Sequence, residues 1–163
     1  MEPDIILDIP PDLERWLDEL AARVKRRGPL MENIAGIMLN AVDENFIQGG
    51  RPTWEPLKYR DGKPLQLSGR LHASVQPWSD NDQAIVGTNV IYAGIQNNGG
   101  RTRAHEIRPR RKKALYFNGR YAKKVNHPGS DIPARPFLSL TDDDYAEIRQ
   151  AIVNYIAGDT PGE

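Results

Sequence analysis

Residues 72–88 have the sequence HASVQPWSDNDQAIVGT, and this stretch decides the fold class. Short runs with β-branched residues and partial alternation lie on either side of the turn Ser79-Asp80-Asn81-Asp82, a composition typical of a β-hairpin. We therefore expect two strands, over residues 71–78 and 83–88. Helical patterns lie before and after this hairpin, and strands and helices do not alternate along the chain. The sequence thus predicts an α+β domain and not a doubly wound α/β fold.

Three stretches have the apolar spacing of helices. The first, about Pro11–Arg27, has acidic residues near its N-terminal end and basic residues near its C-terminal end. Gly28-Pro29 is expected to end it. The second runs roughly over Leu30–Gln48. The last begins at Thr141, which forms a capping-box-like pair with Asp144. The predicted architecture is a small antiparallel, hairpin-built sheet packed against two to three helices. The apolar stripe of the first helix consists of Leu13, Trp16, Leu17, Leu20 and Val24.

The stretch between the second helix and the hairpin is rich in turn-forming residues. Prolines and glycine in residues 51–69 predict an ordered loop with no element of its own, anchored in the core by Trp54 and Leu57. After the hairpin, residues 90–96 are expected to form one short helical turn. The aromatic residues Trp54, Trp78 and Tyr92 are all predicted to belong to the core.

The composition is that of a globular protein. A chain of 163 residues, 39% hydrophobic and 27% charged, is long enough for one domain with its own core. We divide it into an N-terminal segment with an amphipathic helix (residues 1–28), a single α+β domain (residues 29–157) and a flexible tail (residues 158–163). The longest apolar stretch, Ile34–Leu39, is far too short to cross a bilayer, and the acidic start lacks the features of a signal peptide. We expect synthesis in the cytoplasm and no membrane partner.

The charge distribution is strongly uneven. Net charge is zero, yet residues 101–124 hold ten Lys or Arg and one acid, Glu106, which leaves 12 basic and 21 acidic residues elsewhere. Candidate strands at His105–Arg108, Ala114–Phe117 and Arg120–Val125, with the turn Asn118-Gly119, predict a long basic β-hairpin arm that projects from the sheet. Its basic residues are Arg101, Arg103, Arg108, Arg110, Arg111, Lys112, Lys113, Arg120, Lys123 and Lys124.

The residues of a catalytic or metal site do not come together in the sequence. There is no phosphate-binding glycine loop, and without cysteine there is no thiolate ligand, disulfide or cysteine nucleophile. His72, His105 and His127 are scattered beside turns. The acids at the start of the last helix are explained by its dipole more simply than by metal binding. We therefore expect no catalytic residues, no metal, no cofactor and no enzymatic activity.

Five short motifs follow one another along the chain. They are Gly49-Gly50-Arg51-Pro52-x-Trp54-x-Pro56-Leu57, Leu67-Ser68-Gly69-x-Leu71-x-x-Ser74-Val75, Val86-Gly87-Thr88-Asn89 with Tyr92-Ala93, Gly99-Gly100, and Ile132-Pro133-Ala134-Arg135-Pro136-Phe137-Leu138. In this order they resemble the phage virion morphogenesis family, which includes tail-completion proteins of Mu-like and P2-like phages. The resemblance covers roughly residues 30–157, and where a histidine is expected before Gln96 this chain has Ile95.

This resemblance implies a structural protein that completes tails or joins them to filled heads. Such proteins work as rings or plugs on the particle axis, so the expected partners are further copies of the chain and other neck and tail proteins. The expected location is the head–tail junction of the virion, with the host cytoplasm as the place of assembly.

Two roles are open for the basic arm. It contacts the phosphates of packaged double-stranded DNA, or it docks on an acidic face of a neighbouring copy and closes a ring. The equal and opposite charge partition favours the second. The candidate acidic interface is Asp142, Asp143, Asp144 and Glu147.

Two further expectations concern Arg135 and the runner-up function. An unpaired buried guanidinium is costly, so Arg135 is expected to pair with an acid or to lie at a subunit interface, whereas Phe137 and Leu138 are expected to be core anchors. The alternative function is that of a small basic-armed nucleic-acid-binding protein.

Overall fold

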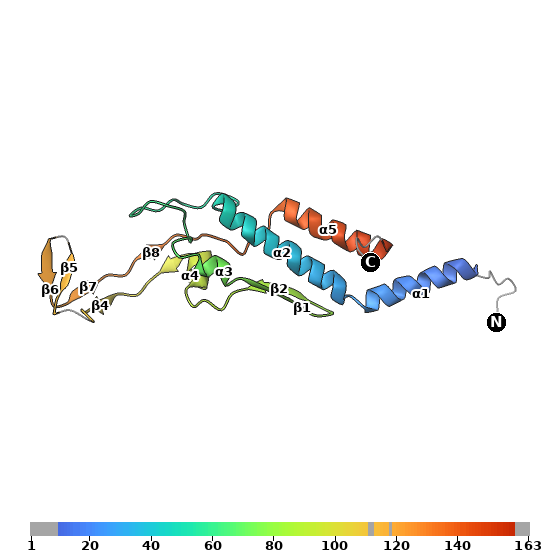
Figure 1. Cartoon of the computed structure of the whole chain (residues 1–163), viewed down its shortest axis with the longest axis horizontal. Coiled ribbons are helices and arrows are strands. Elements are labelled where there is room, and N and C mark those ends of the chain that lie inside the picture. The colour runs from blue at the N-terminus through green and yellow to red at the C-terminus, as the bar shows by residue number, and fades with distance from the viewer. Residues whose placement is uncertain (1–9, 111–112, 118, 159–163) are drawn as a thin grey trace, which may run out of the picture.

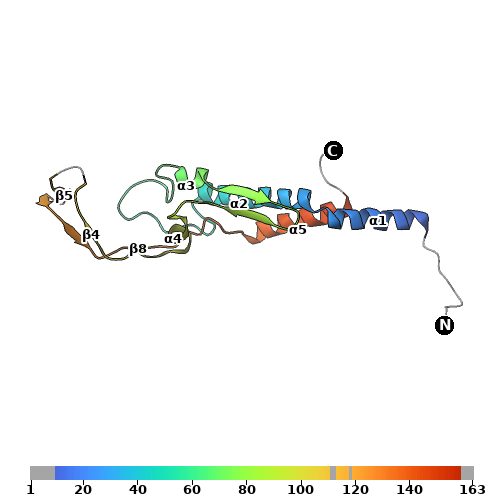
Figure 2. The same cartoon turned by 90° about the horizontal axis from the view of Figure 1, so that it is seen from below.

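The computed structural model describes residues 10–110, 113–117 and 119–158. Two helices form the body: α2 (Gly28–Gln48) lies beside α5 (Asp142–Ala157). On its other side α2 packs against the hairpin of β1 (Gln76–Ser79) and β2 (Ala84–Gly87), so that α2 lies between α5 and the hairpin (Figure 1). Helix α1 (Pro11–Lys25) extends beyond this body at the N-terminal end of α2 in both views (Figures 1 and 2).

The helix ends follow from local chemistry, with one correction. Gly28 and Pro29 do not end the first helix: α1 stops at Lys25, and these two residues form the first turn of α2, where proline needs no N–H partner. At the other end of α2, Gly49 has φ +76°, a left-handed cap that suits glycine. The capping box predicted for α5 is confirmed, since Thr141 and Asp144 bond each other's backbone N–H groups.

The decisive hairpin is present, but it is shorter than predicted. Its register runs from Gln76↔Gly87 to Ser79↔Ala84, and Asp80 closes the turn by accepting from the N–H groups of Asp82 and Gln83 at 2.7 and 2.9 Å. Residues 70–73 are the one-turn helix α3 (Arg70–Ala73) and not part of the first strand. The left-handed Gly69 (φ +69°) redirects the chain there, and Leu71 turns into the core.

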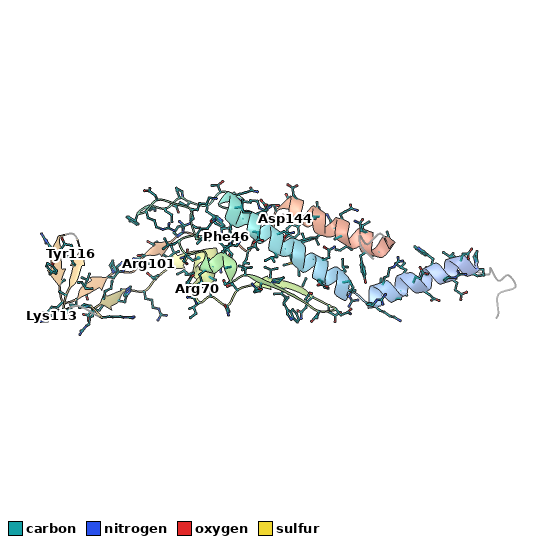
Figure 3. All side chains as sticks on the ribbon, viewed as in Figure 1. Phe46, Arg70, Arg101, Lys113, Tyr116 and Asp144 are labelled. Atoms are coloured by element: carbon teal, nitrogen blue, oxygen red, sulfur yellow. The ribbon has the colours of Figure 1, made fainter. Side chains whose placement is uncertain are left out.

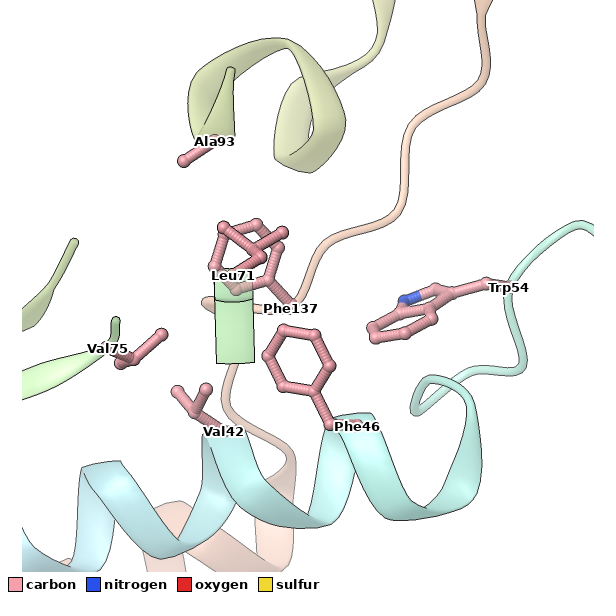
Figure 4. Close-up of a cluster of buried hydrophobic side chains, with 7 residues drawn as sticks. All are labelled: Val42, Phe46, Trp54, Leu71, Val75, Ala93 and Phe137. Atoms are coloured by element: carbon pink, nitrogen blue, oxygen red, sulfur yellow. The ribbon is translucent and has the colours of Figure 1, made fainter. Parts of the chain in front are cut away.

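The hydrophobic core lies between α2, α3, α4 (Ala93–Asn98) and the segment before α5 (Figure 4). Phe46 is its centre: it meets Trp54 edge-on at 5.8 Å between ring centroids, Phe137 at 5.5 Å, and stacks on His72 at 4.4 Å. The cluster consists of Val42, Phe46, Trp54, Leu71, Val75, Ala93 and Phe137.

Two aromatic residues were wrongly assigned to this core. The prediction for Trp54 is confirmed, but the side chains of Trp78 and Tyr92 are 52% and 42% exposed. Trp78 lies on a two-stranded hairpin that packs against α2, and Tyr92 precedes α4 at the surface. Leu138 is also exposed, unlike its neighbour Phe137.

The remaining strands form three antiparallel ladders in succession. They are β3 (Gly100–Arg101) with β8 (Asp131–Ile132), β4 (His105–Ile107) with β7 (Val125–His127), and β5 (Leu115–Phe117) with β6 (Arg120–Ala122). The strand predicted over residues 120–125 is therefore split, because its last part returns as β7 to pair with β4. We call residues 101–131 the distal segment, since β4 to β7 lie at the end of the molecule away from α1 (Figure 1). Helices with small antiparallel two-stranded sheets confirm the α+β class.

Candidate assembly surfaces

The predicted basic residues of the distal segment are exposed wherever the structure describes them. Glu106 accepts from Lys124 Nζ at 2.9 Å and from Arg108 Nε at 2.5 Å. These two partners hold the pKa of Glu106 below its ordinary value, Lys124 having the larger effect, so the carboxylate stays ionised in this setting. Arg111 and Lys112 lie outside the described residues. The exposed bases are Arg101, Arg103, Arg108, Arg110, Lys113, Arg120, Lys123 and Lys124.

Aromatic rings meet across the strands of the distal segment. Tyr116 and Tyr121 are register partners with ring centroids 4.9 Å apart, and His105 and His127 stack at 5.2 Å across the next ladder. Such cross-strand pairs stabilise ladders that have little apolar surface to bury. The two tyrosines remain largely exposed among the cations, and Tyr and Arg are the residue types enriched where proteins contact one another.

The acidic candidates at the start of α5 fall into two groups. Asp142, Asp143 and Glu147 are exposed and form an acidic surface on the helical body. Asp144 is buried and faces the interior, so we leave it out of the candidate interface. Lys113 and Tyr116 lie at one end of the molecule and Asp144 lies on the body, far along the long axis (Figure 3). The basic and acidic surfaces of one copy are therefore too far apart to neutralise each other.

Asp144 belongs to a network that the sequence did not predict. Arg51 donates to both of its carboxylate oxygens, at 3.1 and 2.9 Å, and also to Asn45 Oδ1 and the Ala41 carbonyl, each at 2.8 Å. Asn45 in turn donates to the carbonyls of Phe137 and Ser139. Burial acts to raise the pKa of Asp144, but the bonds from Thr141 and Arg51 outweigh it and leave the pKa below its ordinary value.

Most residues of the resemblance motifs fix turns or pack in the interior of the protein. Gly49, Gly50, Gly69, Gly99 and Gly100 all have positive φ angles. A Cβ on Gly50 would lie 2.6 Å from Trp54 Nε1, and one on Gly99 would lie 2.8 Å from the backbone N of Ala134. Side chains larger than hydrogen therefore do not fit at these two turns.

The segment of Arg135, Pro136 and Phe137 is bound by backbone and amide groups. Asn97 Oδ1 accepts from the N–H groups of Phe137 and Leu138, both at 3.0 Å. Arg135 is buried, and its guanidinium donates to the backbone carbonyl of Glu55 at 3.1 and 3.3 Å instead of pairing with an acidic side chain. A main-chain oxygen that points inward was not visible in the pattern of residue types.

The described part of the chain offers no metal cluster and no membrane span. Among these residues, no three His, Asp or Glu side chains lie close enough together to hold a metal ion. None of the helices described is both long and apolar enough to cross a bilayer. His72 is bound to Asp43 at 2.7 Å, which sequence reasoning also missed, and the pair flanks the core at Phe46.

Comparisons with known proteins find similar sequences. The sequence model of the phage virion morphogenesis family matches residues 11–157. The Mu-like prophage FluMu G protein 2 of Haemophilus influenzae (strain ATCC 51907 / DSM 11121 / KW20 / Rd) is 42% identical over 139 residues, which cover 85% of each chain. No solved structure matches. The family match begins in the first turn of α1, which lies outside the region of the quoted motifs.

Proposed function

Because the chain belongs to the phage virion morphogenesis family, we propose that it is a non-enzymatic structural protein that completes tails or joins them to filled heads. It acts as a homo-oligomer at the head–tail junction of the particle, in contact with other neck and tail proteins, after assembly in the host cytoplasm. The observation that carries this proposal is the separation of two exposed, oppositely charged surfaces on one elongated chain.

The separation favours contacts between copies over contacts within one. The distal segment holds ten bases and one acid between residues 101 and 124, and its exposed cations lie far from the acidic surface of α5. When the distal segment of one copy meets the α5 surface of the next, each copy both gives and receives a contact. Such a head-to-tail contact closes into a ring if the rotation between copies permits, and it suits a protein that works on the axis of a particle.

Light scattering on the purified chain tests the contact. Exposed pairs are screened beyond about 8 Å at physiological ionic strength, so the mass should fall as salt rises. Reversing charge on the distal segment (Arg120→Glu with Lys123→Glu) or on α5 (Asp142→Lys with Asp143→Lys) should lower the mass at low salt. Mixing the two variants should restore assembly. A mass that changes neither with salt nor with charge reversal would refute the proposed interface.

A genetic experiment tests the role itself. Deleting the gene from an inducible copy of its phage should give lysates in which electron microscopy finds heads and tails that are not joined, or tails that are not completed. Supplying the chain in trans should restore infectious particles, whereas the double charge-reversal variants should not. Normal particles in the deletion lysate would refute the proposal.

Nucleic-acid binding is the second candidate, and the exposed cations of β4 to β7 support it. In that case the isolated chain should bind double-stranded DNA of any sequence, with log affinity falling by about 0.9 per phosphate contact for each unit of log salt. Gel shifts with the Arg120→Glu, Lys123→Glu variant separate the two candidates. Lost DNA binding with unchanged mass favours this second function, and lost assembly without any DNA binding favours the first.

A further inference from the structure

Helix α1 presents an apolar face that the described chain leaves mostly exposed, with Leu20 half-buried. No residue of its 15 is buried, and the side chains of Leu13, Trp16, Leu17 and Val24 are 45%, 52%, 42% and 47% exposed. A helix of this length is marginal in water without a packed face, because nucleation is costly. The stripe is therefore a surface built to be covered.

The helix is nevertheless held firmly at its C-terminal end. Asn81, at the tip of the β1–β2 hairpin, accepts from the backbone N–H groups of Arg27 and Gly28 at 2.8 and 3.1 Å and donates to the Lys25 carbonyl at 3.1 Å. Tyr155 of α5 donates to the Arg26 carbonyl, and Arg23 donates to the Ile156 carbonyl at 3.2 Å. These bonds fix the direction in which α1 leaves the body (Figure 2). A face presented in a fixed direction loses less entropy when it binds.

The charges along α1 identify the partner. Residues 11–19 carry four acids and one base, a net charge of −3, whereas residues 20–27 carry four bases and no acid. Two copies side by side in the same direction would place like charges together at both ends. Two copies in opposite directions place the acidic half of each against the basic half of the other.

We propose that α1 pairs in antiparallel fashion with α1 of a second copy of this chain. The spacing of Leu13, Leu17, Leu20 and Val24 is four, three and four residues, which is the repeat of a coiled-coil seam. In the antiparallel pair Leu13 faces Val24 of the partner copy, and Leu17 faces Leu20. Trp16 flanks the seam and supplies the large aromatic surface that often dominates binding energy.

The pair is two-fold symmetric, so it closes at two copies and differs from the head-to-tail contact proposed above. A helix of 15 residues is about 22 Å long at 1.5 Å per residue, which gives a short seam. Because such a seam buries less than the roughly 1,200 Å² of stable complexes, we expect a dimer that depends on protein concentration. The inference rests on α1 alone and stands or falls independently of the ring.

Disulfide cross-linking of the full chain tests both the partner and the direction. The chain has no cysteine, so each introduced thiol is unique. Single variants Leu13→Cys and Val24→Cys, one carrying a tag that changes its mass, are mixed and oxidised. The antiparallel pair should give the mixed disulfide in excess over both homodisulfides. Ala22→Cys, which lies on the opposite, exposed face of α1, is the matched control and should remain uncross-linked.

Sedimentation velocity supplies the second measurement. In the Arg120→Glu, Lys123→Glu background, which removes the head-to-tail contact, the mass should still rise with concentration. Adding Leu17→Glu with Leu20→Glu should abolish that rise while the β1–β2 hairpin and α2 stay folded. The charge-reversed distal variants should still cross-link through α1, so failure of the ring and failure of the pair are distinguishable. Homodisulfides alone would show a parallel pair and refute the proposal, as would a chain that stays uncross-linked, whether because it is monomeric or because α1 binds another protein.

Discussion

Replacing Arg51 by methionine should destabilise the body of the protein more than the loss of an exposed ion pair does. The Arg51 and Asp144 side chains are only 17% and 11% exposed, and the pair is bidentate. Removing one partner of a buried pair costs about 3–5 kcal/mol, because the other charge is left without compensation. Arg51→Met also takes the donor from Asn45 Oδ1, in a side chain that is fully buried. We therefore expect a loss of about 3–5 kcal/mol in the free energy of unfolding.

The reverse substitution should cost less. In Asp144→Asn the guanidinium of Arg51 keeps its bonds to Asn45 and to the Ala41 carbonyl, so the remaining charge stays partly satisfied. We expect about 2–3 kcal/mol for this variant, since fewer groups lose their partners. The double variant should cost less than the sum of the two, with a coupling energy of about 1–3 kcal/mol, because the two groups interact directly.

Urea unfolding followed by tryptophan fluorescence measures all three values, because Trp54 is buried in the folded chain whereas Trp16 and Trp78 are already about half exposed. Lys58→Met is the control, since Lys58 forms an exposed pair with Glu55 at 3.5 Å that is worth about 1 kcal/mol or less. Additive losses, or an Arg51→Met variant no less stable than the control, would refute the view that this network fastens α5 to α2.

Three further predictions concern the same interior. Phe137→Ala should cost about 3–5 kcal/mol of stability in urea unfolding because the ring is fully buried, whereas the exposed Leu138→Ala should cost much less. Gly49→Ala should lose about 1–2 kcal/mol for its left-handed backbone alone, and Gly50→Ala clearly more, since its Cβ would also collide with Trp54; equal losses in thermal unfolding would contradict this clash. The pKa of Asp144 lies below its ordinary 3.8, so its contribution is present above that value and is lost as pH falls through the folded pKa. The stability gap between the unchanged chain and Asp144→Asn should therefore be constant near neutral pH and shrink below about pH 4, as unfolding at a series of pH values will show.

The parts of the fold that the sequence predicted are those set by local chemistry. The capping box at Thr141, the Asp80–Asp82 turn and the second helix each depend on residues within one or two turns of one another. The exchange of roles at Gly28-Pro29 was missed because these residues can both end one helix and start the next. What places them in α2 is Asn81, which is 53 residues away and binds the Gly28 N–H. Such long-range polar bonds leave no periodic signal.

The sequence predicted which residues form the candidate surfaces, but it did not predict which of them are exposed. Sequence identified the bases of the distal segment and the acids of α5, yet it could not distinguish exposed Asp143 from buried Asp144, because both fit the start of a helix. The partner that buries Asp144 is Arg51, which lies 93 residues earlier in a loop motif. Similarly, the stripe of α1 has the spacing of a packed helix, and spacing alone cannot say whether the partner is in the same chain.

The residues that maintain the fold differ from the residues that form the proposed contact surfaces. The motif residues Gly50, Gly99, Arg135 and Phe137 fix turns, bury a ring or satisfy a carbonyl, so they maintain the shape of the chain. A change at such a position alters every surface at once, because each surface depends on the same body. The distal cations, the acids of α5 and the stripe of α1 make few contacts inside the chain and can be altered one surface at a time. A variant on one of these surfaces that loses assembly yet keeps the unfolding curve of the unchanged chain would therefore support the contact proposed for that surface, and this separation allows the proposed contacts to be tested singly.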